Sequence, residues 1–260
     1  MITAGIDMGA KLIKVLVLRD GDVLAKTQEM AGFEPKEAAG KAFERALSEA
    51  GLSERDIDLV YSTGSGRKLA PFAKDSVTEV SAAARGTLFN NPSVRTVIDI
   101  GAEEGRAVKC DDQGRVQDFA VNEKCAAGAG SFTESMSRAL EVPLEEFGKL
   151  SLKSTKTIPM NAQCAVFAES EVVSLMHAKT PKADIARAVH DAIASRIISM
   201  VRRVGINPDI ALVGGVSYNV GFVDSLNRGL ETQVIIPDGA EFVGALGAAL
   251  TAKISLEKSA

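Results

Sequence analysis

One stretch of the chain decides the fold: residues 3–26 read TAGIDMGAKLIKVLVLRDGDVLAK. Runs rich in Ile, Val and Leu are broken at two places, by Gly-Ala-Lys at residues 9–11 and by Asp-Gly at residues 20–21. Short apolar runs separated by glycine-containing turns are typical of strands joined as hairpins. The stretch therefore predicts three antiparallel strands, with the carboxylate of Asp7 close to the first turn.

A second stretch, residues 96–121, repeats this pattern and reads TVIDIGAEEGRAVKCDDQGRVQDFAV. Both stretches carry Asp-x-Gly where the first strand should end, and a basic residue seven positions after the aspartate. Self-similarity of this kind predicts an internal duplication. When Asp7 is placed on Asp99, the further matches are Gly9 on Gly101, Lys14 on Arg106, Leu16 on Val108 and Asp20 on Asp112.

Outside these two meanders, helical periodicity alternates with short apolar runs. Antiparallel hairpins followed by alternating strands and helices predict an α/β protein with mixed sheets. The Asn-Asn-Pro break at residues 90–92 predicts a boundary between two halves, 1–92 and 93–260. The expected helices are 35–52, 131–140, 143–150, 165–177, 182–204, 220–230 and 241–250, and the expected further strands are 57–61, 210–214 and 233–237.

The composition excludes several classes of protein. Of 260 residues, 46% are hydrophobic and 25% charged, the net charge is -4, and no long uncharged apolar run occurs, so we expect no membrane span. The N-terminus has neither a basic region nor an apolar signal core, which predicts a cytoplasmic protein. Basic residues are scattered, and we therefore expect no nucleic-acid partner. Three cysteines, an odd number, argue against a disulfide framework and for buried, reactive or metal-bound thiols.

The two Asp-x-Gly turns are candidates for binding phosphate. A strand that ends in Asp-x-Gly presents a carboxylate, while the glycine lets backbone N–H groups approach an anion closely. Carboxylates at such turns usually act through a hydrated Mg²⁺. A third glycine turn, at residues 214–216, follows a predicted strand and could pack against a nucleoside. Each motif alone is common in ordinary turns, but three in this order, two of them duplicated, favour a nucleotide site.

These motifs define the candidate residues for nucleotide chemistry. The predicted catalytic residues are Asp7, Asp99, Glu103 and Glu104. The predicted nucleotide-binding residues are Gly9, Ala10, Lys11, Lys14, Gly101, Ala102, Gly214, Gly215, Val216, Asn219 and Gly244.

Two of the cysteines lie just ahead of predicted helices. Cys125 occurs in NEKCAAGAGSF and Cys164 in MNAQCAVFAESEV. The N-terminal end of a helix favours a thiolate or an anionic cluster. A buried cysteine can also be merely a small apolar residue. For Cys110, which ends a predicted strand next to Asp111 and Asp112, we expect no role in a cluster. A four-iron cluster needs four thiolates, so two from this chain would require a symmetric dimer to complete the set.

The segments GIDMGAKLIK, VIDIGAEEGRAVK, LVGGVSYN and VGALGAAL resemble the phosphate, adenosine and closing-helix segments of the actin, heat-shock chaperone and sugar kinase superfamily. This resemblance implies that type of ATPase fold, with two duplicated halves around a hinged cleft for ATP or ADP.

Together with KCAAGAGSF and CAVFAESEV, these segments resemble, over nearly the whole chain, the BadF/BadG/BcrA/BcrD ATPase family. That family comprises 2-hydroxyacyl-CoA dehydratase activators and the ATP-binding subunits of benzoyl-CoA reductase. The resemblance implies that Cys125 and Cys164 bind one [4Fe-4S] cluster between two subunits, either identical or related. It also implies a ferredoxin or flavodoxin as electron donor and an acyl-CoA-reducing or dehydratase partner.

The residues at several motif positions favour one branch of this family. The chain has Gly-Ala-Lys at residues 9–11 where activators usually have Gly-Ser-Thr, and Gly-Ala-Glu-Glu at 101–104 where they have Gly-Gly-Gln-Asp. Ala129 stands where activators have Thr. With Met-Asn-Ala-Gln-Cys at 160–164, these differences resemble the benzoyl-CoA reductase branch, active in anaerobic degradation of aromatic compounds.

Two other functions are compatible with parts of the sequence. A small-molecule kinase of the same fold would need a carboxylate base on the substrate side and neither cysteine. A nucleotide-switched assembly module would bind ATP without redox chemistry.

Overall fold

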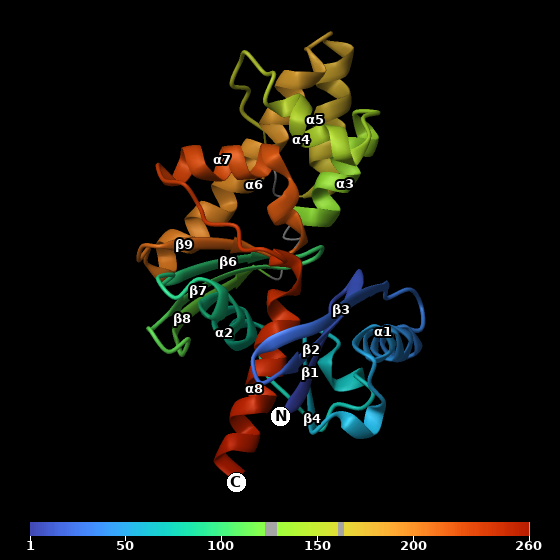
Figure 1. Ribbon diagram of the computed structural model, residues 1–260. Coiled ribbons are helices and arrows are strands. Elements are labelled where there is room, and N and C mark those ends of the chain that lie inside the picture. The colour runs from blue at the N-terminus through green and yellow to red at the C-terminus, as the bar shows by residue number, and fades with distance from the viewer. Residues whose placement is uncertain (123–128, 161–163, 260) are drawn as a thin grey trace. The chain divides into compact units, whose positions relative to one another are not determined.

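The computed structural model describes residues 1–122, 129–160 and 164–259 (Figure 1). The chain forms two compact units. The first comprises Met1–Val97, Cys110–Gln117 and Pro237–Ala260, and the second Ile98–Lys109 and Asp118–Ile236. These units differ from the predicted halves 1–92 and 93–260, because the C-terminal helix packs with the N-terminal strands. The predicted α/β class with two sheets is confirmed.

A five-stranded sheet in the order β3-β2-β1-β4-β5 organises the first unit. β1 pairs antiparallel with β2 and parallel with β4. In this register Asp7 lies opposite Lys14 on one side and opposite Thr63 on the other. The strands are β1 Ile2–Met8, β2 Leu12–Arg19, β3 Asp22–Met30, β4 Leu59–Thr63 and β5 Asp75–Ser76.

The two faces of this sheet are covered by different helices. Alternate residues of a strand point to opposite faces, and in β2 Val15 and Val17 join the core beneath α1 while Leu16 and Leu18 pack against α8. The helix expected over 35–52 is confirmed as α1 (Pro35–Ala50), which ends at Gly51 with φ 64°. A left-handed glycine at this position commonly terminates a helix.

Helix α8 (Val243–Ser259) is longer than the predicted helix 241–250 and is preceded by the short turn η4 (Ala240–Phe242). Small residues let it approach its neighbours closely: a Cβ added at Gly247 would lie 1.9 Å from the carbonyl oxygen of Ala82. Ala82 belongs to α2 (Glu79–Asn90), a helix that is not among those expected from the sequence. Most of the buried residues of α2 are small, namely Ala82, Ala83, Ala84 and Gly86, so no stripe of large apolar residues marks it.

The second sheet has the order β8-β7-β6-β9, which repeats the order β3-β2-β1-β4 of the first. The predicted duplication is therefore confirmed at the level of sheet topology. Its strands are β6 Thr96–Ile100, β7 Gly105–Cys110, β8 Val116–Asn122 and β9 Ile210–Val213. The predicted strand 233–237 is wrong, because in this segment only Ile235 makes an isolated bridge, to Ala211.

The helices of the second unit share one apolar core with this sheet, and α6 contributes the largest part of it. The predicted helices are confirmed, three of them with the expected bounds. They are α3 Ala129–Ala139, α4 Leu144–Ser151, α5 Ala165–His177, α6 Lys182–Val204 and α7 Val220–Leu230, with the short turn η3 Gly215–Tyr218 before α7.

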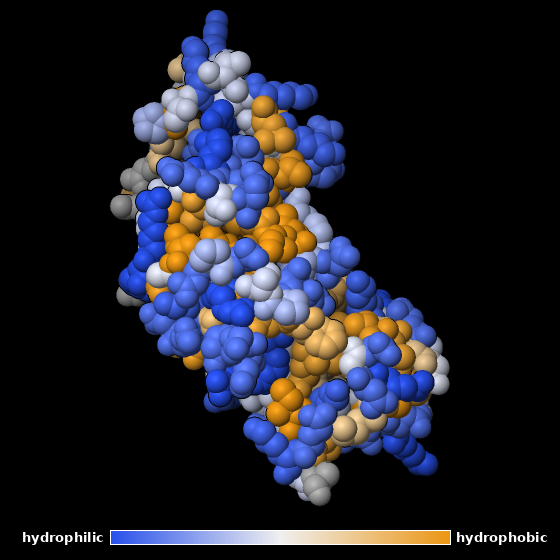
Figure 2. All heavy atoms as spheres, turned by 60° about the vertical axis from the view of Figure 1, so that its left-hand side comes forward, coloured by the Kyte–Doolittle hydropathy of each residue, from blue (hydrophilic) through white to orange (hydrophobic). Residues whose placement is uncertain are grey.

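Hydrophilic side chains predominate on the face drawn in Figure 2, and hydrophobic ones gather in patches between them. Among the helices of the described ranges, none is both long enough and apolar enough for a bilayer crossing.

Candidate functional site

The first Asp-x-Gly turn joins β1 to β2. Asp7 lies one residue before the end of β1, and residues 9–11 form the turn. Lys14 Nζ lies 3.4 Å from Asp7 Oδ2, and the side chains are 13% and 17% exposed. The hairpin register creates this pair, because Asp7 and Lys14 face each other across the strands. The turn thus places a carboxylate and an ammonium group together at a strand end.

Two glycines make room for the carboxylate of Asp7. A Cβ at Gly64 would lie 2.7 Å from Asp7 Oδ1 and 2.6 Å from the backbone oxygen of Met8, and Gly64 has φ +92°. A Cβ at Gly244, in the first turn of α8, would lie 3.2 Å from Asp7 Oδ2. Gly244 is among the predicted residues, whereas Gly64 is not.

The second Asp-x-Gly turn joins β6 to β7 and repeats the ion pair. Arg106 Nη1 lies 3.2 Å from Asp99 Oδ2, and the other terminal nitrogen of the Arg106 guanidinium contacts Glu104. Glu103, by contrast, is exposed. The turn is closed by a hydrogen bond of 2.9 Å from Gly101 N to the carbonyl oxygen of Glu104. The predicted alignment of Lys14 on Arg106 thus corresponds to the same pairing in both turns.

The start of α3 packs against this second turn. Ser131 N donates to the carbonyl oxygen of Ala102 at 2.9 Å, and Gly130 N donates to that of Gly101 at 3.3 Å. A Cβ at Gly130 would lie 2.9 Å from the Cα of Ala102, so glycine is needed for this approach.

Gly214 stands beside Asp99 as Gly64 stands beside Asp7. It has φ +87°, and its Cβ would lie 2.4 Å from the carbonyl oxygen of Ile100 and 2.9 Å from Asp99 Oδ1. Gly214 is predicted from the Gly-Gly pair as a nucleoside-binding residue, while its equivalence to Gly64 becomes visible only in the structure. The signal in the sequence is the position of each glycine directly after a strand.

The third predicted turn continues from Gly214 into η3. Around Gly215 a Cβ would meet nothing within 4 Å, whereas Val216 is buried. Asn219 caps α7, because its Oδ1 accepts hydrogen bonds from the backbone N–H groups of Gly221 at 3.0 Å and Phe222 at 3.1 Å. The side chain of Asn219 therefore has a structural role beside the predicted one.

His190 of α6 lies buried behind this turn. Its Nδ1 is 2.7 Å from the carbonyl oxygen of Ala186, and the centre of its ring lies 4.9 Å from that of Phe147. Burial lowers the pKa of His190 to about 4, although the hydrogen bond to the carbonyl oxygen of Ala186 partly opposes the shift. The imidazole is therefore neutral near pH 7.

Of the two predicted cluster ligands, Cys125 lies outside the described residues. Cys164 is a free, partly exposed cysteine that immediately precedes α5, as predicted. Cys110 is buried at the end of β7, and burial raises its pKa to about 11. Within the described ranges no group of three or more His, Cys, Asp and Glu residues is arranged to hold a metal.

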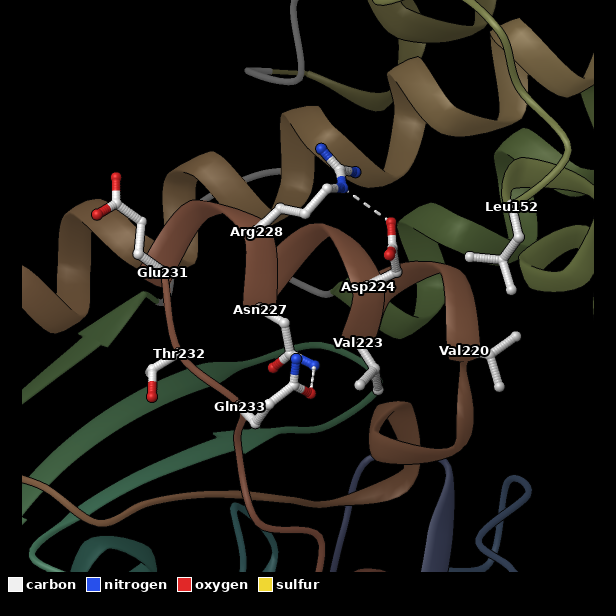
Figure 3. Close-up of a pocket in the computed structure, with 9 residues that line it drawn as sticks. All are labelled: Leu152, Val220, Val223, Asp224, Asn227, Arg228, Glu231, Thr232 and Gln233. Carbon is white, nitrogen blue, oxygen red and sulfur yellow. Dashed lines mark hydrogen bonds and ion pairs between the residues drawn. The ribbon is translucent and has the colours of Figure 1, made fainter.

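A surface hollow of about 520 Å³ lies along α7 (Figure 3). Its polar side chains pair with each other: Arg228 Nε donates to Asp224 Oδ2 at 2.9 Å, and Asn227 Nδ2 to Gln233 Oε1 at 2.8 Å. None of the predicted site residues lines it.

Comparison with known proteins gives a consistent result. The family model described as the BadF/BadG/BcrA/BcrD ATPase family matches residues 4–252. The activator of lactoyl-CoA dehydratase of Anaerotignum propionicum is 38% identical over 99% of this chain and 100% of its own. The 2-hydroxyisocaproyl-CoA dehydratase activator of Clostridioides difficile is 36% identical over 97% and 95%. One of the subunits of the benzoyl-CoA reductase of Thauera aromatica is 33% identical over 100% and 95%.

Solved structures agree with this. The (R)-2-hydroxyglutaryl-CoA dehydratase component A of Acidaminococcus fermentans superposes with a TM-score of 0.94 at 36% identity, covering 99% of both chains. The activator of 2-hydroxyisocaproyl-CoA dehydratase from Clostridium difficile, with bound ADPNP, gives 0.92 at 36% identity, covering 100% of this chain and 97% of that one. A glucokinase from Streptomyces griseus gives 0.61 at 16% identity, covering 98% and 100%, which shows the fold alone. The predicted actin and sugar kinase type of fold is confirmed.

Proposed function

The chain belongs to the BadF/BadG/BcrA/BcrD ATPase family, and from this premise we propose that it hydrolyses ATP to drive electron transfer through a [4Fe-4S] cluster shared by two subunits. One observation carries the nucleotide part. The carboxylates of Asp7 and Asp99 each stand at a strand end, paired with a cation and bounded by a glycine of positive φ.

The donor set at these turns fits Mg²⁺ and phosphate. Asp7 and Asp99 are partly exposed carboxylates, which suit an ion that keeps several of its waters. Lys14 and Lys11 would neutralise phosphate charge at the first turn, where Gly9 and Ala10 would contribute backbone N–H groups. Gly101 and Ala102 serve the second turn, while Gly215 and Val216 would face the nucleoside. Mg²⁺ would offset the negative charge of the polyphosphate.

The group that orients the attacking water is best sought at the second turn. Glu104 is held by Arg106, whereas the side chain of Glu103 is exposed. A carboxylate that orients water must reach a proton beside the reacting phosphate. We therefore assign this role to Glu103.

Cys164 is suited to bind one iron of the proposed cluster. Its thiol is free and partly exposed at the N-terminus of a 13-residue helix, where the helix dipole favours negative charge. Two residues in the first turn of that helix, Val166 and Phe167, are 67% and 70% exposed, and exposed apolar side chains of this size suit a subunit contact. Cys125 would supply the second thiolate, and the other subunit the remaining two. A cluster so held would accept and release one electron.

Free-energy magnitudes limit what nucleotide binding alone can do. A coupling of about 1–3 kcal/mol, typical of two linked sites, corresponds to about 40–130 mV for one electron. Binding therefore shifts the cluster potential only modestly. We propose that hydrolysis makes the transfer one-way, by changing how the subunits engage their partner.

The partner is proposed to be an acyl-CoA dehydratase or reductase, with a ferredoxin or flavodoxin as donor. The residues at 9–11 and 101–104 favour the benzoyl-CoA reductase branch, but the comparisons with known proteins do not favour it specifically. Two dehydratase activators reach 36–38% identity, against 33% for the reductase subunit. We therefore propose a dehydratase activator first and a benzoyl-CoA reductase subunit as the second candidate.

Anaerobic purification with iron counting and visible absorption tests the cluster. We expect about four irons per dimer, lost in Cys125→Ala and in Cys164→Ala. Cys110→Ala is the matched control and should keep its iron. Iron-free protein from strictly anaerobic cells would reject the electron-transfer proposal. Phosphorylation of a sugar by the colourless protein would establish the kinase alternative instead.

A further inference from the structure

Thr63, the last residue of β4, has a buried hydroxyl without a partner among the described residues. The residue is 1% exposed, and its Oγ1 makes no hydrogen bond to any of them. A hydroxyl group has one donor and two acceptor positions, and burying all of them unpaired is unfavourable. Such a hydroxyl can serve a bound group where it also lies beside a binding site.

Thr63 and Asp7 are neighbours across the sheet. They are Cα partners in the parallel pairing of β4 with β1, so their side chains project from the same face. A Cβ at Gly244 would lie 3.2 Å from Asp7 Oδ2 and 3.7 Å from the methyl carbon Cγ2 of Thr63, so both side chains border Gly244. The side chain of Thr63 thus lies beside the carboxylate proposed to act on Mg²⁺.

Two further observations tie this hydroxyl to the first turn in particular. The turn itself, Gly9-Ala10-Lys11, contains no hydroxyl side chain. In the second unit, the residue before the equivalent glycine, Gly214, is the apolar Val213. A hydroxyl at the end of this strand is therefore not required for building the strand and its glycine.

We propose that Thr63 is a positioning residue of the Asp7 site, whose hydroxyl hydrogen-bonds a water in the hydration shell of nucleotide-bound Mg²⁺. The inference rests on the proposed ATPase function and adds a residue to it. The ammonium group of Lys14 can only donate, and the carboxylate of Asp7 can only accept. The Thr63 hydroxyl does both, so it can match whichever orientation the carboxylate imposes on the water.

A second buried threonine provides the control. Thr87 of α2 is 0% exposed, and its Oγ1 also lacks a partner among the described residues. It lies inside a helix and not at a strand end beside a carboxylate. Thr87→Val thus repeats the chemical change of Thr63→Val in the same unit, without the proposed role.

The test is a calorimetric titration of each variant with ADP, once with Mg²⁺ and once with EDTA. Loss of a hydrogen bond near a charged group predicts that Thr63→Val weakens Mg-ADP binding about tenfold, with ADP binding in EDTA unchanged. Thr63→Ser should bind within about twofold of wild type, since it keeps the hydroxyl. Thr87→Val should match wild type in both titrations. Thr63→Ala, without the hydroxyl, serves if Thr63→Val does not fold.

Three results would overturn the inference while leaving the proposed function intact: no effect of removing the hydroxyl, an equal loss with and without Mg²⁺, or Thr63→Ser failing as Thr63→Val does. The second and third would show a role in packing. If the wild-type protein binds no Mg-ADP, the proposed function itself is overturned. This titration of the wild-type protein does not depend on any result from the variants.

Discussion

In the first unit Asp7 meets the ammonium group of Lys14, whereas in the second unit Arg106 holds two carboxylates, Asp99 and Glu104. The strand ends beside them differ as well, with Thr63 before Gly64 and Val213 before Gly214. Duplication thus preserved the backbone geometry, while the polar groups diverged. The first turn has a hydroxyl that no described residue pairs, and the charges of the second turn are largely paired within the protein.

The glycines that border both turns should show the largest effect and should behave alike. Gly64→Ala and Gly214→Ala each place a Cβ within 2.6 Å of a backbone atom at positive φ. We expect each to cost at least about 3 kcal/mol of unfolding free energy and to abolish ATP hydrolysis. Chemical denaturation and phosphate release measure these quantities.

Gly40→Ala is the matched control, because its Cβ would meet nothing within 4 Å inside α1. It should be neutral or stabilising by up to about 1 kcal/mol. If only one of the two bordering glycines proves sensitive, the structural equivalence of the turns has no functional counterpart.

The second unit should lose stability in mild acid through His190. Its pKa is lowered from 6.5 to about 4. Between these two pH values the imidazole binds a proton in the unfolded chain but stays neutral in the folded one. Stability should therefore fall between pH 6.5 and pH 4, by about 3 kcal/mol in total. Urea unfolding across this range measures the loss.

His190→Gln should remove this part of the pH dependence, so its stability relative to wild type should improve as the pH falls. The variant His177→Gln, at the C-terminus of α5, provides the comparison for a histidine outside the core. A parallel pH profile in wild type and His190→Gln would contradict the assignment.

Removing the cation of each turn should lower the unfolding free energy by different amounts in the two units. Arg106→Met leaves Asp99 and Glu104 facing each other, and we expect a loss of about 2–3 kcal/mol. Lys14→Met leaves a single carboxylate, partly exposed, and should cost about 1 kcal/mol. Urea denaturation of both variants at one pH checks the order, and equal losses would show that Glu104 does not add to the difference.

The described cysteines should differ in reactivity more than in stability. The pKa of Cys110 is raised to about 11 by burial, so at pH 8 roughly one thiol in a thousand is ionised. Iodoacetamide should label Cys164 in the native iron-free protein and Cys110 only after unfolding. Mass spectrometry of tryptic fragments distinguishes them, and early labelling of Cys110 would show that β7 opens readily.

Much of this site could be predicted from local spacing. The pairs Asp7–Lys14 and Asp99–Arg106 are separated by seven residues, and a tight hairpin brings such positions opposite each other. The helix beginning after Cys164 was likewise readable from periodicity. Helix α2 was not, because its burial comes from small residues packed against α8 and leaves no amphipathic pattern.

The sequence by itself determined the duplication, the strand–turn–strand order and the carboxylate of each turn, because these depend on neighbours along the chain. Only the tertiary structure decided that Gly64 and Thr63 stand beside Asp7, and that Gly214 stands beside Asp99. Pairing between strands that lie far apart in sequence leaves no periodic signal, and an absent Cβ matters only once another backbone occupies its space.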